Sequence, residues 1–183
     1  MLFVLSGPSG VGKGTVSKRL QSTVPNLWLS VSWTTRAPRP DEVDGVDYVF
    51  VTKEEFEAER DSGGFYEWFE VFGDLKGTPR RPVEQHLDAG WDVLLEIDVQ
   101  GALKVKALEE SAVLIFLMPP SGKELRRRLV SRGTESPEAL DQRLAGAAAE
   151  EARAPDFDHV VVNDDLERVV SEVAGILAGS SHP

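Results

Sequence analysis

Residues 2–15, LFVLSGPSGVGKGT, decide the architecture of this chain of 183 residues. The run Leu2–Ser6 is apolar, as in a strand that is buried on both faces of a parallel sheet. From Gly7 to Lys13 the chain matches the pattern G-x-x-x-x-G-K, and a helical pattern follows. Glycines let backbone N–H groups curl around phosphate oxygens, a helix N-terminus adds partial positive charge, and the lysine adds a full charge. The stretch therefore predicts a strand, a phosphate-binding loop and a helix.

The residue after the lysine departs from the usual motif. Ser or Thr normally follows the lysine and ligates Mg²⁺, whereas this chain has Gly14 and then Thr15. Either Thr15 takes that role or the ion is held mainly through water, which Mg²⁺ readily keeps. The residues expected to surround the nucleotide phosphates are Gly7, Pro8, Ser9, Gly10, Val11, Gly12, Lys13, Gly14 and Thr15.

Further short apolar runs follow along the chain and are separated by helical patterns. Strands of this composition that alternate with helices form a doubly wound α/β sheet. The additional runs are Trp28–Ser32, Val93–Asp98, Ala112–Met118 and His159–Asn163. Together with the first run they predict a parallel sheet of five strands.

Local signals mark where individual helices begin and end. Thr52 with Glu55 fits a capping box, in which each residue bonds the backbone of the other. Thr78 followed by Pro79 predicts a helix whose first residue is the proline, and Gly90 is expected to end that helix.

The segment from residue 33 to residue 90 interrupts the alternation. It contains the short alternating runs Tyr48–Val51 and Phe65–Val71, which predict small strands of their own. We therefore expect an inserted subdomain with a separate small sheet, placed where a substrate could bind.

A second dense motif lies at the start of this insertion, with SVSWTTRAPRP at residues 30–40 and GVDYVF at residues 45–50. Two arginines three residues apart, beside hydroxyl groups, suit a phosphate monoester because guanidinium forks pair with phosphate oxygens. With these motifs the chain resembles the guanylate kinase family over nearly its whole length. The other matching segments are FYEWFEVFGDLKGT (65–78), LLEIDVQGA (94–102), SRGTES (131–136) and VVNDDL (161–166).

The resemblance implies an α/β fold with a P-loop kinase core, in which helices flank a five-stranded parallel sheet. It also implies an inserted mixed-sheet subdomain that binds the nucleoside monophosphate, and a helical lid. The chain would form a single domain. Its expected parts are a core of residues 1–32, 91–121 and 153–179, a monophosphate-binding subdomain of residues 33–90, a lid of residues 122–152 and a disordered tail of residues 180–183.

The implied reaction is ATP + GMP ⇌ ADP + GDP with Mg²⁺, and dGMP is a further candidate acceptor. Guanine would be read by Ser32, Glu67 and Thr78, and the phosphate of GMP would be held by Arg36, Arg39 and Tyr48. A carboxylate such as Glu67 suits guanine because the base presents N1–H and N2–H₂ as adjacent donors. Adenine presents no such pair.

The resemblance also implies residues for catalysis, for the metal and for ATP. The charge on the moving phosphoryl group would be offset by Lys13, Arg39, Arg132 and Arg143, of which the last two belong to the lid. Asp98, at the end of a central strand, would contact GMP and help to place Mg²⁺ through water, with Thr15 as the other metal contact. Asn163 would lie near the adenine of ATP.

Lys76 stands where the family usually has a tyrosine that donates to the phosphate of GMP. A lysine can replace that donor with a charge, but it does not supply an aromatic ring. We therefore expect GMP binding to be retained, with altered affinity and a steeper dependence on salt.

The charge distribution narrows the class of partner. The net charge of −11 argues against nucleic acid and anionic membranes as partners. Residues 1–40, however, hold five Lys or Arg and no acid, and residues 122–134 hold five bases and one acid. These two basic segments carry the phosphate loop, the arginine pair and a lid arginine, so a small anion such as a nucleotide remains a fitting ligand.

The composition also bears on the compartment. The chain has no cysteine, which excludes disulfides and thiolate chemistry, and no apolar run approaches the roughly 20 residues that span a bilayer. Its start lacks the basic segment of a signal peptide. We expect a cytoplasmic protein, and the sequence leaves the oligomeric state open.

Two other functions compete with GMP phosphorylation. One is a P-loop kinase for AMP, a pyrimidine nucleotide or a ribose phosphate, against which Glu67 argues. The other is a guanylate-kinase-like module that binds phosphopeptides without chemistry. Such modules typically have a degraded phosphate loop or altered lid arginines, whereas Lys13, Arg132 and Arg143 are all present here.

Overall fold

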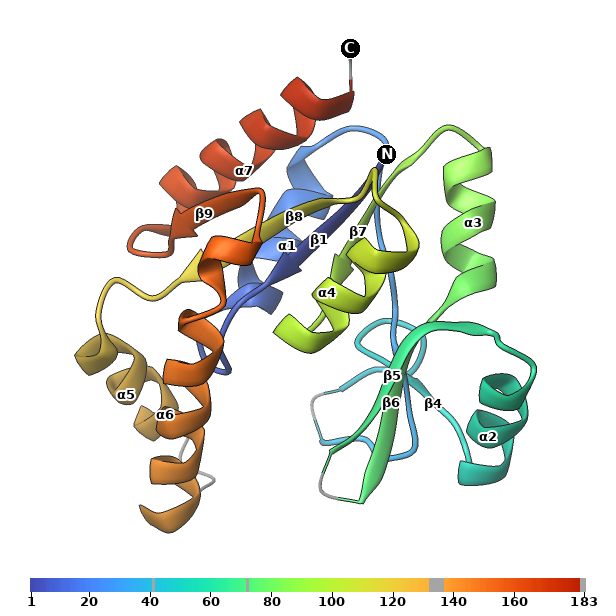
Figure 1. Cartoon of the computed structure of the whole chain (residues 1–183), viewed down its shortest axis with the longest axis horizontal. Helices are drawn as coiled ribbons and strands as arrows, with labels where there is room; N and C mark the ends of the chain where they lie inside the picture. Colours follow the sequence, from blue (N-terminus) through green and yellow to red (C-terminus); the bar gives the residue numbers. More distant parts are fainter. Residues whose placement is uncertain (41, 72, 132–136, 182–183) are drawn as a thin grey trace.

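The computed structural model describes residues 1–40, 42–71, 73–131 and 137–181. Its centre is a five-stranded sheet in the order β2-β7-β1-β8-β9, and every pairing in it is parallel (Figure 1). The strands are β1 (Leu2–Ser6), β2 (Leu27–Leu29), β7 (Asp92–Glu96), β8 (Val113–Met118) and β9 (His159–Val162). The expected five-stranded parallel sheet is confirmed, although β2 ends at Leu29 and not at Ser32.

The central strand β1 contributes to a hydrophobic core on each face of the sheet. Leu2 and Val4 pack in the cluster that includes residues of α4 (Val99–Leu108). Phe3 and Leu5 point the other way, into the cluster with residues of α1 (Lys13–Thr23) and α7 (Leu166–Ser181). Successive side chains of a strand alternate between faces, which explains why an apolar residue stands at every one of these positions.

The inserted segment forms a second, mixed sheet in the order β4-β3-β6-β5. Its strands are β3 (Trp33–Thr34), β4 (Val49–Phe50), β5 (Phe65–Val71) and β6 (Asp74–Pro79). The β3–β4 pairing is parallel, whereas β6 runs antiparallel to both β3 and β5. The helix α2 (Lys53–Asp61) covers this sheet, with Phe56 packed against Phe65 and Leu75 in a small core of their own.

The expected helix start at Pro79 is wrong. Pro79 is the last residue of β6, and α3 (Arg80–Asp88) begins one residue later. Thr78 does not cap the helix because its hydroxyl donates to a carboxylate of β5 instead. Gly90 follows the helix with φ = 82°, a left-handed conformation that favours glycine, as expected at a helix end.

The helix α3 lies in the expected subdomain segment but packs against the core. Its buried Val83 belongs to the cluster that includes Val93 and Leu95 of β7. The ring of His86 stacks on Trp28 of β2, with ring centroids 3.9 Å apart. By packing, α3 therefore belongs with the main sheet, and the last strand of the mixed sheet ends at Pro79.

Two helices form the expected lid segment, α5 (Gly122–Ser131) and α6 (Pro137–Glu151). They share a small apolar cluster in which Leu125 and Leu129 face Ala147. In Figure 1 these helices lie on one side below the main sheet and the mixed sheet lies on the other. A short 3₁₀ helix, η1 (Ala154–Asp156), leads from α6 towards β9.

The C-terminal helix corrects one expectation, since α7 continues through Ser181. Disorder from residue 180 onwards is therefore wrong for residues 180 and 181. Within the described part of the chain, none of the helices combines the length and the apolar character needed to cross a membrane.

Candidate functional site

The phosphate loop joins β1 to α1 at the carboxyl edge of the sheet. Gly7, Gly10 and Gly12 all have positive φ, and α1 begins at Lys13. A Cβ on Gly7 would lie 2.3 Å from the carbonyl oxygen of Leu117 in β8, so no larger residue fits there. The motif thus forms the predicted strand–loop–helix turn, with N–H groups at a helix N-terminus.

Lys13 lies across the loop that precedes it. Its Nζ donates to the carbonyl oxygens of Gly7 at 2.5 Å and Pro8 at 3.3 Å. Burial lowers the pKa of this ammonium, while the nearby carboxylates of Glu96 and Glu150 act in the opposite direction. The ammonium group of Lys13 thus lies at the loop, and a bound phosphate can replace its contacts with these carbonyl oxygens.

A cavity of about 390 Å³ lies on the outer side of the loop. Its described lining is Gly10, Gly12, Thr15, Arg128, Ser131, Asn163, Asp164 and Leu166. Arg128 of α5 donates to the carbonyl oxygens of Val11 at 2.9 Å and Asn163 at 3.0 Å. The side-chain amide of Asn163 also donates to the Val11 carbonyl, at 2.7 Å. The structure therefore joins α5, the loop and the end of β9 around one cavity.

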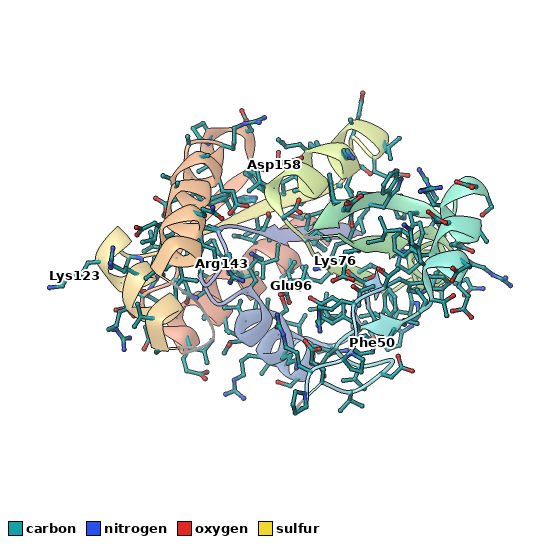
Figure 2. The ribbon with its side chains drawn as sticks, turned by 90° about the horizontal axis from the view of Figure 1, so that it is seen from below. Phe50, Lys76, Glu96, Lys123, Arg143 and Asp158 are labelled. Atoms are coloured by element: carbon teal, nitrogen blue, oxygen red, sulfur yellow. The ribbon has the colours of Figure 1, made fainter. Side chains whose placement is uncertain are left out.

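A second cavity, of about 320 Å³, lies between the loop helix and the inserted subdomain. Its described lining is Gly14, Lys18, Leu29, Ser30, Ser32, Glu42, Val46, Asp47, Tyr48, Lys76 and Glu96. In Figure 2, Glu96 lies between Arg143 on the lid side and Lys76 on the side of the small sheet. Lys18 of α1 bridges to Asp47 of the insertion at 2.6 Å and so links the two parts of the molecule beside this cavity.

The expected phosphate clamp is paired with an internal carboxylate. Both terminal nitrogens of Arg36 donate to Glu42, at 2.9 Å each, and the Arg39 N–H donates to the same carboxylate at 2.8 Å. Arg36 holds the pKa of Glu42 below its usual value. Glu42 lines the 320 Å³ cavity, whereas Arg36 and Arg39 are not among the described residues that line it. The Arg39 side chain is 70% exposed, so the structure does not bring it into the cavity.

Lys76 does lie in the cavity, next to Tyr48. Its Nζ donates to the Tyr48 hydroxyl at 3.3 Å and lies 5.0 Å from the ring centroid. Burial lowers the pKa of Lys76, but Tyr48, Glu67 and Glu96 outweigh that effect and the pKa is raised. The side chain therefore carries its positive charge at neutral pH, beside an aromatic hydroxyl.

Glu67 lies in a smaller cavity beyond Lys76, of about 10 Å³, together with Phe69, Ile97 and Asp98. It is 5% exposed, and Thr78 donates to its Oε1 at 2.5 Å. Burial raises the pKa of Glu67 to about 7, with a contribution from Asp98, while the Thr78 bond opposes the shift. The register of the mixed sheet creates this pair, because Glu67 of β5 lies opposite Thr78 of β6.

Asp98 and Thr15, the two expected metal contacts, do not share a cavity. Asp98 caps α4, accepting the Gly101 N–H at 2.8 Å, whereas Thr15 lies in the cavity beside Asn163. The carboxylate next to the loop helix is Glu96, whose Oε1 would be 3.5 Å from a Cβ on Gly14. Among the described residues there is no cluster of three or more His, Asp or Glu side chains suited to hold a metal ion directly.

The two expected lid arginines differ in what the structure shows. Arg143 of α6 reaches the phosphate loop, where its guanidinium donates to the Ser9 hydroxyl at 3.5 Å. Arg132 lies outside the described residues.

Some residues of the site were missed by sequence reasoning. Glu42 has a weak signal, since it is one of the first acids after an acid-free stretch of forty residues. Glu150 has no signal in the sequence, because acids are common in its segment. Its position near Lys13 depends on how α6 packs.

Comparison with known proteins finds relatives along nearly the whole chain. The family model described as guanylate kinase matches residues 1–180. A guanylate kinase of Thermus thermophilus is 57% identical over 177 residues, which cover 96% of this chain and 80% of the relative. That of Mycobacterium sp. (strain MCS) is 52% identical over 180 residues, which cover 97% of this chain and 91% of the relative.

Solved structures agree with these sequence relatives. The crystal structure of guanylate kinase from Anaplasma phagocytophilum matches with a TM-score of 0.83 and 39% identity, covering 100% of this chain and 87% of that one. A sugar kinase from Janibacter sp. matches with a TM-score of 0.54 and 16% identity, over 96% of this chain and 93% of the other, and this likeness shows the fold alone. By its sequence relatives, its fold and its phosphate loop, the chain belongs to the guanylate kinase family.

Proposed function

We propose that this chain transfers the terminal phosphoryl group of ATP to GMP, giving ADP and GDP. The observation that carries the proposal is the buried carboxylate of Glu67, held by Thr78 and separated from the phosphate loop by a cavity with a charged lysine. A buried carboxylate with two free lone-pair directions can accept the adjacent N1–H and N2–H₂ donors of guanine.

GMP would lie with its base towards Glu67 and Asp98 and its phosphate in the larger cavity. Lys76 lines both cavities, so it stands where the two halves of the nucleotide would meet. Ser32 would add a hydroxyl from the larger cavity, and Tyr48 would hold the phosphate together with Lys76.

Arg36 can reach the phosphate while it remains paired with Glu42. Its Nη1 donates to the Glu42 carboxylate and to the carbonyl oxygen of Ala37, and its Nη2 donates to the Glu42 carboxylate. A guanidinium has five N–H donors, so the edge formed by Nε and the outer Nη2 hydrogen is available for a second bidentate acceptor. Arg39, which is exposed, would turn inwards when the anion binds.

ATP would occupy the loop and the cavity beside Asn163. The loop N–H groups and Lys13 would hold its phosphates, and the adenine would lie near Asn163 and Arg128. Arg143 already contacts Ser9, and together with Arg132 it would offset the charge that develops on the moving group.

A Mg²⁺ ion fits this arrangement through water. The missing side chain of Gly14 leaves room beside the Glu96 carboxylate, and Mg²⁺ commonly keeps several waters while it bridges one carboxylate and substrate phosphates. Glu96 would thus hold the hydrated ion, with Thr15 on the far side of the loop. When bound, the ion supplies neutralisation of phosphate charge.

The reaction needs no side-chain base. A phosphate monoester has a second pKa near 6, so at pH 7 the acceptor is largely a dianion and already a nucleophile. The chain's own task is to align the two phosphates, neutralise charge and exclude water. The lid helices and the mixed sheet, on either side of the loop, would close to do so.

A panel of nucleoside monophosphates tests the proposal. Steady-state ADP production is measured with ATP·Mg²⁺ and GMP, dGMP, AMP, CMP or UMP as acceptor. Activity with GMP and dGMP far above the others is expected. Preference for another monophosphate would favour the rival small-molecule kinase, and phosphopeptide binding without any ADP production would favour the interaction module.

A further inference from the structure

Gly101 of α4 lies directly against the carboxylate that is proposed to read guanine. A Cβ at this position would stand 3.3 Å from each of the Cγ, Cδ and Oε2 atoms of Glu67. Carbon atoms in protein interiors gain most from contact at about 3.5–4.0 Å, so a methyl group here would press on the Glu67 side chain. Gly101 itself is buried, as is Glu67.

Glu67 has little room to yield. Its Oε1 is bonded to the Thr78 hydroxyl at 2.5 Å, on a strand that is paired with its own. On the side of α4, the Gly101 N–H is bonded to the cap residue Asp98 at 2.8 Å, which holds the first turn of the helix in place. The carboxylate is therefore enclosed between a hydrogen-bonded strand and a capped helix.

The backbone at this position does not itself require glycine. Gly101 is absent from the glycines with positive φ and lies within the helix Val99–Leu108. Glycine is a poor helix former, and alanine in its place would ordinarily stabilise the helix. The glycine at this position must therefore have an advantage other than its backbone conformation.

We propose that Gly101 is a positioning residue, whose missing side chain sets the place of Glu67 and thereby the selectivity for guanine over bases that lack the 2-amino group. The inference rests on the proposed function, since it concerns the same pocket. Gly101 would act only through Glu67. A carboxylate displaced by a few tenths of an ångström would keep one of the two guanine donors at good geometry and weaken the bond to the other.

The kinetic test compares Gly101→Ala with the wild type, using GMP and IMP, whose base presents N1–H but no 2-amino group. Gly175→Ala is the control, because it adds a methyl to a helical glycine with nothing within 4 Å. We expect kcat/KM for GMP to fall about tenfold in Gly101→Ala, mainly through KM, and to fall less for IMP. Gly175→Ala should change neither value.

The results separate this inference from the proposed function. A wild type that does not phosphorylate GMP would remove the proposed function. An active wild type whose GMP-to-IMP ratio is unchanged by Gly101→Ala, or whose two activities fall equally, would overturn the role of Gly101.

A second measurement does not depend on activity. The urea midpoint is determined for Gly101→Ala alone and combined with Glu67→Ala, which removes the crowded side chain. With Glu67 truncated, Gly101→Ala should raise the midpoint, as Gly175→Ala does in the wild type. With Glu67 present it should lower the midpoint or leave it unchanged. Equal shifts in both backgrounds would overturn the proposal, and this comparison remains decisive even if the single variant folds poorly.

Discussion

Glu67 is a buried acid that is costly for folding, and in the proposed site the same residue would recognise guanine. Burial raises its pKa to about 7, while the Thr78 bond, Lys76 and Lys104 act to lower it. Near neutral pH the empty site therefore holds a mixture of the protonated and ionised acid. Guanine donors would favour the ionised form, so binding of GMP and loss of the proton should be coupled.

Stability should follow the ionisation of Glu67. Since its folded pKa is above its ordinary value of 4.5, its favourable contribution is complete below about pH 4.5 and is lost as the pH rises through about 7. Glu67→Gln should therefore be more stable than the wild type at pH 8, by up to about 3 kcal/mol, with the difference shrinking towards pH 4.5. Urea unfolding at both pH values measures it. If the stability difference between Glu67→Gln and the wild type did not depend on pH, the raised pKa of Glu67 would be contradicted.

The same ionisation should appear in the affinity for GMP. Because only the carboxylate can accept both guanine donors, KM for GMP should rise as the pH falls below 7. The phosphate of GMP also titrates, with a second pKa near 6. Glu67→Gln separates the two effects. In this variant KM for GMP should still depend on pH through the phosphate, but the dependence that comes from Glu67 should be absent.

Lys76 gives a prediction about charge at the acceptor phosphate. Lys76→Tyr removes a positive charge beside Tyr48, so KM for GMP should rise about tenfold at low salt and depend less on salt. Lys53→Met is the matched control, because it removes an exposed lysine from the start of α2 in the same subdomain. An unchanged KM with unchanged salt dependence would show that Lys76 does not meet the phosphate.

At the scale of elements, local signals were sufficient where both partners are close in the sequence. The capping box at the start of α2 is formed as expected: Glu55 N–H donates to the Thr52 hydroxyl at 3.2 Å and the Thr52 N–H donates to the Glu55 carboxylate at 2.8 Å. The signal at Thr78-Pro79 failed because a distant partner, Glu67 of the neighbouring strand, competes for the same hydroxyl. Capping rules consider only the backbone groups that a side chain can reach nearby in the sequence.

The α2 cap predicts a stability change without a kinetic one. Thr52→Ala should lower the free energy of unfolding by about 1 kcal/mol, since it removes one cap bond at a helix N-terminus. Urea unfolding measures the effect, with Thr52→Ser as a control that keeps the hydroxyl. KM for ATP should stay unchanged, because α2 lies in the mixed-sheet part, away from the phosphate loop; a change would contradict this separation.

At the scale of the molecule, the site is divided among three packed parts. The main sheet supplies the loop and Glu96, the mixed sheet supplies Glu67 and Lys76, and the helix α6 supplies Arg143. Each part has a hydrophobic cluster of its own, but Tyr66 of β5 packs in a cluster of the main sheet. In the proposed closure around two substrates, the mixed sheet would therefore stay attached to the core at Tyr66.

Closure can be tested at Arg143. Arg143→Ala should reduce turnover on the order of 10³-fold, as is typical when an arginine that stabilises the transferring group is lost, with a smaller effect on KM for ATP. Arg153→Ala serves as the control, because that exposed arginine pairs with Asp156. Near-native turnover in Arg143→Ala would remove the lid helix from the catalytic arrangement.

The sequence by itself determined the parallel sheet, the phosphate loop, the α2 cap and the existence of a separate small sheet. These features depend on apolar runs, glycine spacing and residues three or four positions apart, all of which are visible along the chain. Tertiary structure alone decided the pairing of Arg36 with Glu42, the protonation of Glu67 and the approach of Gly101 to that carboxylate. Arg36 and Glu42 are six residues apart and meet within one loop, whose course no local pattern predicts. The other two features result from burial and from the close approach of β5 to α4, and no local pattern encodes how tightly those elements pack.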